Sequence, residues 1–360
     1  LAVQQMAELG TKWQSSINAA VGATWRRSHT PTVEDGTGGT QFVMPQYEFV
    51  VDNGGEILLN AKADELIVED GRVVGVSGVT TEGQAFEMRA TRAVIMATGG
   101  FGANVEMREY YNTMWDNLGE EIGTSNGPFA QGDGIVMAEA VGAQLTGMEW
   151  IQILPTWGPG VITTYIENQI YVNKEGERIV REDGRRDELS AAILKQTDSA
   201  IYIVNDSRLV DEDGLSITGL NVNERVEAGS VLKADTVAEL AELIGCEADT
   251  LQASIDQFNA SVENGNDPFG RTVFDQKIET GPFYAGLVTP AVHHTMGGVK
   301  INTDCQVLDM NDEPIPGLFA AGEVTGGIHG SNRLGGNAIT DIAVFGRIAG
   351  QRAMEEPARD

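Results

Sequence analysis

The chain has 360 residues, which is enough to bury a large core and to form two domains. Its 53 acidic and 24 basic residues give a net charge of −29, which argues against a nucleic acid or an anionic membrane as a partner. The sequence contains no apolar run of about 18 residues that would span a bilayer, and its two cysteines exclude a disulfide framework.

The first half of the chain is predicted to alternate short strands with helices. It begins with a helical pattern, followed by a loop rich in glycine and threonine at 30–40. β-Branched and alternating residues predict short strands at 56–60, 65–68 and 72–76, the last two joined as a hairpin. Residues 92–98 are predicted to form a buried strand that ends in Gly99-Gly100, and such strand ends are where α/β sheets bind ligands.

The pattern changes between about residues 150 and 290, where aromatic residues and a charged stretch appear. Two amphipathic helices are expected there, the first capped by Asp235 or Thr236 and the second beginning near Asp249. We therefore expect residues 150–290 to form an inserted capping domain of mixed α and β structure. The remaining residues, 1–149 and 291–360, would form the first domain.

The segment at 290–341 carries the most specific chemical signal. Residues 292–298 read Val-His-His-Thr-Met-Gly-Gly, and a buried strand further on ends in Gly322-Glu323. A glycine-dense loop then holds His329 and Arg333 before Leu-Gly-Gly-Asn-Ala opens a helix. A loop that lets the backbone approach a ligand, followed by a helix N-terminus, is typical of a cofactor site.

These motifs resemble the flavoprotein subunits of the fumarate reductase and succinate dehydrogenase superfamily. The branch of soluble fumarate reductases, flavocytochromes and urocanate reductases is the most similar, and residues 332–338 are the most specific match. The resemblance implies the α/β class, with a Rossmann-like FAD-binding domain and FAD as the cofactor. It implies these FAD contacts: Ala97, Thr98, Gly99, Gly100, Asp133, Gly134, His294, Gly322, Glu323, Asn337, Ala338 and Ile339.

One part of the family pattern is not found in the sequence. The family opens with a strand, a G-x-G-x-x-G turn and a helix, which together receive the ADP pyrophosphate. The chain contains no such motif. We therefore expect this first βαβ unit to lie outside the segment or in another chain, and we expect the polypeptide alone to bind FAD poorly.

The resemblance also implies a reaction, in which a hydride passes from reduced flavin N5 to a C=C bond activated by a clamped carboxylate. A proton is then added to the neighbouring carbon. Arg333 and His293 match the family's carboxylate ligands, and bidentate cations suit this task. Arg186 matches the proton donor. Because arginine normally stays protonated, this role requires a dry, positively charged pocket.

Three positions depart from the fumarate reductase pattern. Leu154 stands where these enzymes have a histidine that binds the second carboxylate, and Ile162 and Tyr165 replace their glutamate–arginine proton relay. A second carboxylate that faces apolar side chains would be costly to bury. We therefore expect a mono-carboxylated enoate such as an aryl acrylate, bound in a pocket formed by Leu154, Trp157, Ile162 and Tyr165.

Other readings of the same residues stay open at this point. Arg186 can instead pair with Glu182 or Asp187 on a solvated turn, and His293 and His294 can be core histidines. The aromatic cluster at 150–157 can equally belong to the core. The four histidines are too scattered to indicate a metal site, and Cys305 is expected in a surface turn without a function.

Alternative functions also stay open. The protein can be a dicarboxylate reductase of the fumarate type whose relay uses Glu167 or Glu177, a steroid-type dehydrogenase, or a flavin-free subunit without activity of its own. The electron donor is not identified, and another domain, a cytochrome or an FMN protein are the candidates. The resemblance suggests a role in anaerobic respiration and favours an extracytoplasmic (periplasmic or secreted) location over a cytoplasmic one.

Overall fold

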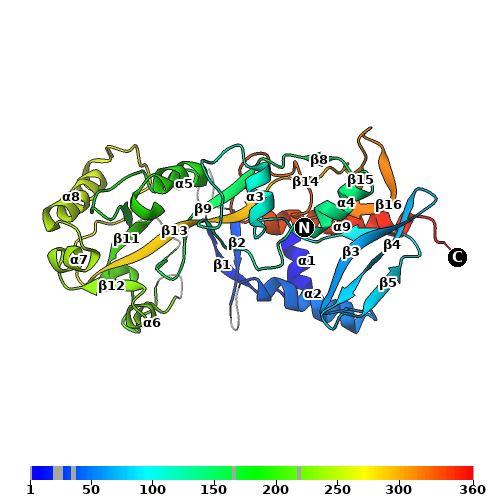
Figure 1. Cartoon of the computed structure of the whole chain (residues 1–360). Helices are drawn as coiled ribbons and strands as arrows, with labels where there is room; N and C mark the ends of the chain where they lie inside the picture. Colours follow the sequence, from blue (N-terminus) through cyan, green and yellow to red (C-terminus); the bar gives the residue numbers. More distant parts are fainter. Residues whose placement is uncertain (1, 19–26, 34–37, 164–167, 217–219, 360) are drawn as a thin grey trace. The chain divides into compact units, whose positions relative to one another are not determined.

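The computed structural model describes residues 2–18, 27–33, 38–163, 168–216 and 220–359. The chain forms two compact units, each of which mixes helices with strands, so the predicted α/β class is confirmed. Unit 1 consists of residues 1–114, 126–151 and 294–360, and unit 2 consists of residues 115–125 and 152–293. Figure 1 labels their elements in chain order.

Unit 1 is built around two parallel strands, β6 (Val94–Met96) and β16 (Pro314–Ala320), with β15 (Gln306–Leu308) antiparallel to β16. Residues 318–320 of β16 are fully buried, as expected for an apolar run in a parallel sheet. Helix α9 (Asn337–Glu355) packs on this sheet, where its Ala349 and Ala353 meet Phe319. The strands and helix expected from the glycine-rich C-terminal segment are therefore present.

A second sheet of unit 1 contains the predicted hairpin, made of β3 (Ala61–Glu69) and β4 (Arg72–Thr80), with β5 (Ala85–Arg89) as its third strand. The turn residues Asp70 and Gly71 both have positive φ (49° and 76°), as a two-residue type I′ turn requires. The remaining elements of unit 1 are α1 (Ala2–Leu9), β1 (Trp13–Asn18), β2 (Ser28–Pro31), α2 (Thr40–Asp52), α3 (Val105–Tyr111), α4 (Asp133–Ala140), β8 (Leu145–Thr146) and β14 (Gly298–Val299).

Two local expectations for unit 1 were wrong. Residues 56–60 do not form a strand: the segment has no strand pairing among the described residues, the Asn60 carbonyl accepts a single bond from the Thr81 N–H, and Leu59 is 65% exposed. A strand without a hydrogen-bonded neighbour has nothing to hold its extended backbone. Cys305 does lie in a turn, with φ 63°, but it is fully buried against Phe319 and α9. The polar residues beside Cys305 therefore predicted the turn correctly, but they did not predict that the Cys305 side chain is buried.

Unit 2 is organised by the long strand β13 (Phe283–Thr295), whose last two residues belong to unit 1. Its sheet has the order β10 (Ile170–Val172), β11 (Ile201–Asp206), β13 and β12 (Val231–Ala234), all antiparallel. Two further strands also pair with β13. They are β7 (Gly123–Thr124), which runs parallel to it, and β9 (Ile151–Trp157). This pairing with β7 explains why residues 115–125 belong to unit 2.

The two predicted amphipathic helices of unit 2 are confirmed as α7 (Val237–Ile244) and α8 (Ala248–Asn264). Thr236 caps α7, because its hydroxyl accepts the Glu239 N–H while the Glu239 carboxylate accepts the Thr236 N–H. Leu240, Leu251 and Phe258 bury the apolar faces of these helices in one core. The other helices of unit 2 are α5 (Arg186–Leu194), α6 (Val222–Glu227) and the short 3₁₀ helices Thr197–Ser199 and Ser207–Leu209.

Beside this core lies a buried network of four charged side chains: Arg178, Glu182, Asp267 and Arg271. Glu182 accepts hydrogen bonds from Arg178 Nη2 (2.7 Å) and Arg271 Nη1 (2.8 Å), and Arg178 also pairs with Asp267. Two positive and two negative groups thus compensate one another, as burial requires.

In the described part of the chain, no helix is both long and apolar enough to cross a membrane.

Candidate functional site

In unit 1, the segments expected to contact a cofactor pack tightly against one another. After β6, the chain passes through Thr98 to Gly100, and a Cβ atom at Gly100 would overlap the Thr295 hydroxyl and the Glu323 carboxylate. A Cβ atom at Gly134, in the first turn of α4, would likewise overlap the Thr98 hydroxyl. Only glycine allows these close approaches of backbone and side chain. The structure therefore brings together four segments that are distant in the sequence.

Glu323 is the central acidic group of this cluster. Its Oε1 accepts hydrogen bonds from the backbone N–H (2.9 Å) and the hydroxyl (3.2 Å) of Thr295. Burial raises the pKa of the Glu323 carboxyl, while the Thr295 hydrogen bonds and the charges of Arg333 and His329 act in the opposite direction. A half-buried carboxylate that keeps acceptor capacity is suited to bind hydroxyl groups of a ligand.

The glycine-rich loop carries His329 and Arg333, and His294 at the end of β13 lies in the same unit. His329 Nε2 lies 3.2 Å from Asp341 Oδ2 on α9, and the ring of His294 packs edge-on against His329, with centroids 5.3 Å apart. His294 Nδ1 also lies 3.5 Å from Glu323 Oε1. Arg333 is only 6% exposed. The loop residues singled out from the sequence are therefore mostly buried and lie near Glu323.

The loop ends at the N-terminus of α9. Gly336 precedes the helix in a left-handed conformation (φ 82°), and Asn337, Ala338 and Ile339 form its first turn. The N–H groups of Asn337 and Ile339 donate to the carbonyl oxygens of Leu334 and Gly336, each at 3.2 Å, so the loop itself caps this end of the helix. Asp133 occupies the corresponding first position of α4 and pairs with Lys62 at 3.2 Å.

In unit 2, Arg186 is the first residue of α5, and its Nη1 lies 3.3 Å from Oε1 of Gln152 on β9. Burial lowers the pKa of the Arg186 guanidinium. None of the ion pairs between described residues includes Arg186, because Asp187 pairs with Arg185 at 2.8 Å and Glu182 pairs with Arg178 and Arg271. The alternative in which Arg186 is a solvated partner of Glu182 or Asp187 is therefore not the arrangement observed.

Leu154 lies on the same face of β9 as Gln152, because successive side chains of a strand alternate. Ile153 between them is buried on the opposite face. The other predicted pocket residues are placed differently: Trp157 is 44% exposed, and Ile162 is fully buried in a cluster with Val222, Val231 and Tyr284. Tyr165 lies outside the described residues, and the pocket as a whole stays a prediction.

His293, on β13 of unit 2, is held by a residue that the sequence did not indicate. Its Nδ1 lies 2.6 Å from Oγ of Ser125, which is 168 residues away in the sequence. Gln152 was also missed, although its position two residues before Leu154 on one strand could have identified it. No local signal could have identified Ser125.

Comparison with known protein families shows which family the chain belongs to. A family model described as an FAD-binding domain matches residues 2–339. The chain belongs to this FAD-binding domain family. The match confirms the flavoprotein resemblance seen in the sequence, since it extends over most of the chain.

Several proteins of known activity are similar to this FAD-binding domain protein. NADH:acrylate oxidoreductase of Vibrio harveyi is 39% identical over 98% of the chain, which spans 36% of that protein. Urocanate reductase of Eggerthella lenta is 42% identical over 83% of the chain, with 50% of that protein covered. The open conformation of a flavocytochrome c3 fumarate reductase matches with a TM-score of 0.77, at 37% identity, over 98% of the chain and 62% of the known structure. The chain thus spans only part of each relative.

The residues of unit 1 fit FAD. Gly100 and Gly134 let the 98–100 segment pack directly against Glu323 and α4, and Glu323 can accept hydrogen bonds from sugar or ribityl hydroxyls. Which of these residues touch FAD stays a prediction.

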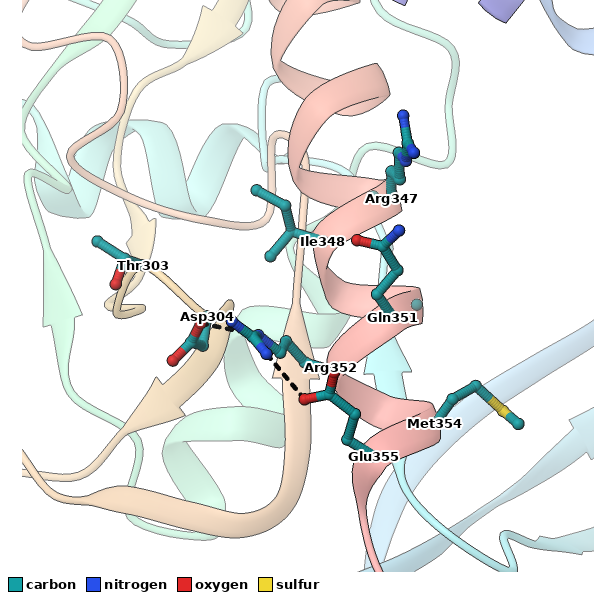
Figure 2. Close-up of a pocket in the computed structure, with 10 residues that line it drawn as sticks. Thr303, Asp304, Arg347, Ile348, Gln351, Arg352, Met354 and Glu355 are labelled. Atoms are coloured by element: carbon teal, nitrogen blue, oxygen red, sulfur yellow. Dashed lines mark hydrogen bonds and ion pairs between the residues drawn. The ribbon is translucent and has the colours of Figure 1, made fainter.

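A separate hollow of about 850 Å³ lies along the C-terminal half of α9 (Figure 2). Figure 2 shows Arg352 between Asp304 and Glu355, and its guanidinium is 2.8 Å from a carboxylate oxygen of each. None of the residues predicted for the site lines this hollow. This hollow is therefore separate from the predicted cofactor and substrate sites of this FAD-binding domain protein.

Proposed function

We propose that the protein containing this chain is an FAD-dependent reductase of the C=C bond of an enoate, with Arg186 as the proton donor. The environment of Arg186 is the observation that carries this proposal. Its guanidinium is partly withdrawn from solvent and contacts the neutral amide of Gln152 at 3.3 Å. An arginine that served only structure would be expected to pair with a carboxylate, as Arg178, Arg185 and Arg271 do in the same unit.

In the proposed reaction, each of these residues of the chain has a separate role. When bound, FAD supplies the hydride through N5. Arg186 holds the proton at its guanidinium, and burial lowers the cost of releasing this proton to the substrate carbon. Gln152 Oε1 accepts a hydrogen bond from Arg186 Nη1, so it orients the guanidinium without neutralising it by an opposite charge. The proton lost by Arg186 must then be replaced from solvent.

His293 and Arg333 would hold the carboxylate of the substrate. Both side chains carry N–H donors suited to a carboxylate, and the planar guanidinium of Arg333 can donate two parallel hydrogen bonds. Binding the carboxylate by cationic or N–H donors withdraws electron density from the conjugated C=C bond. The bond then accepts a hydride at the carbon distant from the carboxylate, and Arg186 would protonate the carbon next to it.

The substrate is proposed to carry one carboxylate. Leu154 shares a strand face with Gln152, the partner of Arg186, so an apolar side chain stands beside the proposed proton donor. A second carboxylate would find no donor in the Leu154 side chain. The names of the Vibrio harveyi and Eggerthella lenta relatives, which refer to acrylate and urocanate, support this class, because both compounds are enoates with one carboxylate.

A fumarate-type dicarboxylate reductase is the second candidate. The similarity to the flavocytochrome c3 fumarate reductase, at a TM-score of 0.77, favours it. The two candidates differ in the number of carboxylates that the site must bind, and they can be distinguished by the choice of oxidant.

Anaerobic oxidation of the reduced flavoprotein by a panel of enoates tests the proposal. The whole protein is reduced chemically, and flavin absorbance is followed after addition of acrylate, cinnamate, urocanate or fumarate. We expect rapid re-oxidation by at least one of the first three and slow re-oxidation by fumarate. Fumarate as the only good oxidant would support the dicarboxylate alternative. A purified protein without flavin absorbance would instead indicate a subunit without flavin chemistry.

A further inference from the structure

We infer that Ser125 positions His293 and determines which of its ring nitrogens carries the proton, so that His293 presents Nε2–H to the substrate. This inference rests on the proposed role of His293 as a carboxylate ligand. Ser125 itself would not touch the substrate, and it is therefore a positioning residue.

Strand pairing brings the two residues together. β7 runs parallel to β13, with Thr124 opposite Val292, so that the next residue of each strand, Ser125 and His293, is also adjacent. The Ser125 N–H donates to the Val292 carbonyl at 2.9 Å, which fixes the backbone of Ser125. Its hydroxyl oxygen then lies 2.6 Å from His293 Nδ1. The contact is therefore supported by the backbone hydrogen bonds of the sheet.

The direction of this hydrogen bond follows from counting donors around the Val292 carbonyl. That oxygen accepts the Ser125 N–H at 2.9 Å and the Thr124 hydroxyl at 3.1 Å, and a carbonyl oxygen has two lone pairs. The Ser125 hydroxyl is further from it, at 3.3 Å. We assign the Ser125 hydroxyl as the donor to His293 Nδ1, its nearer acceptor at 2.6 Å, and this assignment leaves the ring proton of the neutral imidazole on Nε2.

Two consequences follow for the site. The hydrogen bond prevents rotation of the imidazole that would exchange Nδ1 for a carbon atom. In addition, neutral His293 remains an N–H donor at Nε2, so carboxylate binding does not require the imidazolium form. Substrate affinity should therefore change little as the pH rises through the range in which histidine loses its charge.

The test compares Ser125→Ala with Ser125→Thr, which retains the hydroxyl. Ser261→Ala is the matched control, because Ser261 is a buried serine of unit 2 whose hydroxyl donates to the Gln257 carbonyl. With acrylate or urocanate as the oxidant, Ser125→Ala should raise KM by about 3- to 30-fold, with a much smaller change in kcat. Its KM should also become pH-dependent. Ser125→Thr and Ser261→Ala should stay close to the wild type.

A readout without turnover is nitrogen-15 NMR of the protein labelled at its four histidines, with His293 assigned from a His293→Gln variant. The wild type should show an unprotonated Nδ1 and a protonated Nε2, and Ser125→Ala should lose this pattern. A proton on Nδ1 in the wild type, or an unchanged pattern in Ser125→Ala, would overturn the inference. Should Ser125→Ala fold poorly, Ser125→Cys, whose thiol is a weaker donor, should show a smaller loss.

The NMR result also separates this inference from the proposed function. If no enoate re-oxidises the reduced protein, the proposed function fails, while the proton position on His293 still supports or contradicts the role of Ser125. If enoates are reduced but Ser125→Ala leaves KM and its pH dependence unchanged, only the role of Ser125 is overturned.

Discussion

Arg186 and Gln152 are 34 residues apart in the sequence, and their side chains meet at 3.3 Å where helix α5 begins beside strand β9. The contact gives a half-buried cation a neutral acceptor. In water the guanidinium would be fully solvated, whereas here burial lowers its pKa, and no carboxylate of the described residues forms an ion pair with it. Such an arrangement makes the proton of arginine easier to transfer.

Replacing Arg186 by glutamine should lower kcat with the best enoate by about 10²- to 10⁴-fold, the range expected for loss of a general acid. Flavin absorbance per protein should not change, because Arg186 lies outside the cofactor cluster of unit 1. The adjacent Arg185→Gln is the control, since Arg185 is exposed and pairs with Asp187. Equal losses in both variants, or loss of flavin in Arg186→Gln, would exclude Arg186 as the proton donor.

Replacing Leu154 by histidine should shift the preference toward dicarboxylates. A histidine on this face of β9 could donate a hydrogen bond to a second carboxylate, and hydrogen bonds to charged groups contribute about 1.5–3 kcal/mol. The ratio of kcat/KM for fumarate to that for acrylate should rise by about 10- to 150-fold, and more at low pH, where histidine is protonated. The volume-conserving Leu154→Met should leave the ratio unchanged. No shift in Leu154→His would mean that Leu154 does not face the substrate.

The raised pKa of Glu323 predicts a pH-dependent stability for the flavin-free protein. Between the ordinary pKa of glutamate and the raised value, the folded state binds more protons than the unfolded state. Glu323 therefore makes the protein less stable as the pH rises through this window. Glu323→Gln keeps an Oε1 acceptor for Thr295 but cannot ionise, so its melting temperature relative to the wild type should increase between about pH 4 and pH 7.5.

The exposed Glu82→Gln is the control for this experiment. Its melting temperature should differ from the wild type by the same amount at both pH values. A pH-independent difference for Glu323→Gln would show that the burial of Glu323 does not shift its pKa in solution.

Breaking the buried charge network should destabilise the protein strongly. Glu182→Gln leaves the cations of Arg178 and Arg271 without their shared carboxylate, and removal of one partner from a buried pair costs about 3–5 kcal/mol. Denaturant unfolding measures this loss. Glu263→Gln, which removes a surface partner of Lys277, should have a far smaller effect. Similar losses in the two variants would contradict the structural role of the network.

Much of the fold could be predicted because it depends on residues that are close in the sequence. The β3–β4 hairpin follows from Asp70-Gly71 between two apolar runs, and α7 follows from Thr236 and Glu239 at capping-box spacing. The strand at 56–60 was predicted by the same kind of pattern and was wrong, because a strand also requires a neighbouring strand. Local patterns predict elements reliably only where the element is stabilised locally.

The sequence by itself determined the family and its cofactor, because the glycine-rich motifs at 97–100, 132–134 and 322–338 are contiguous and specific. Only the tertiary structure decided which neighbours the reactive residues have. Gln152 reaches Arg186, and Ser125 reaches His293, through strand and helix packing across 34 and 168 residues. Burial and hydrogen-bond partners are properties of the packed chain, and these determine proton positions and pKa values.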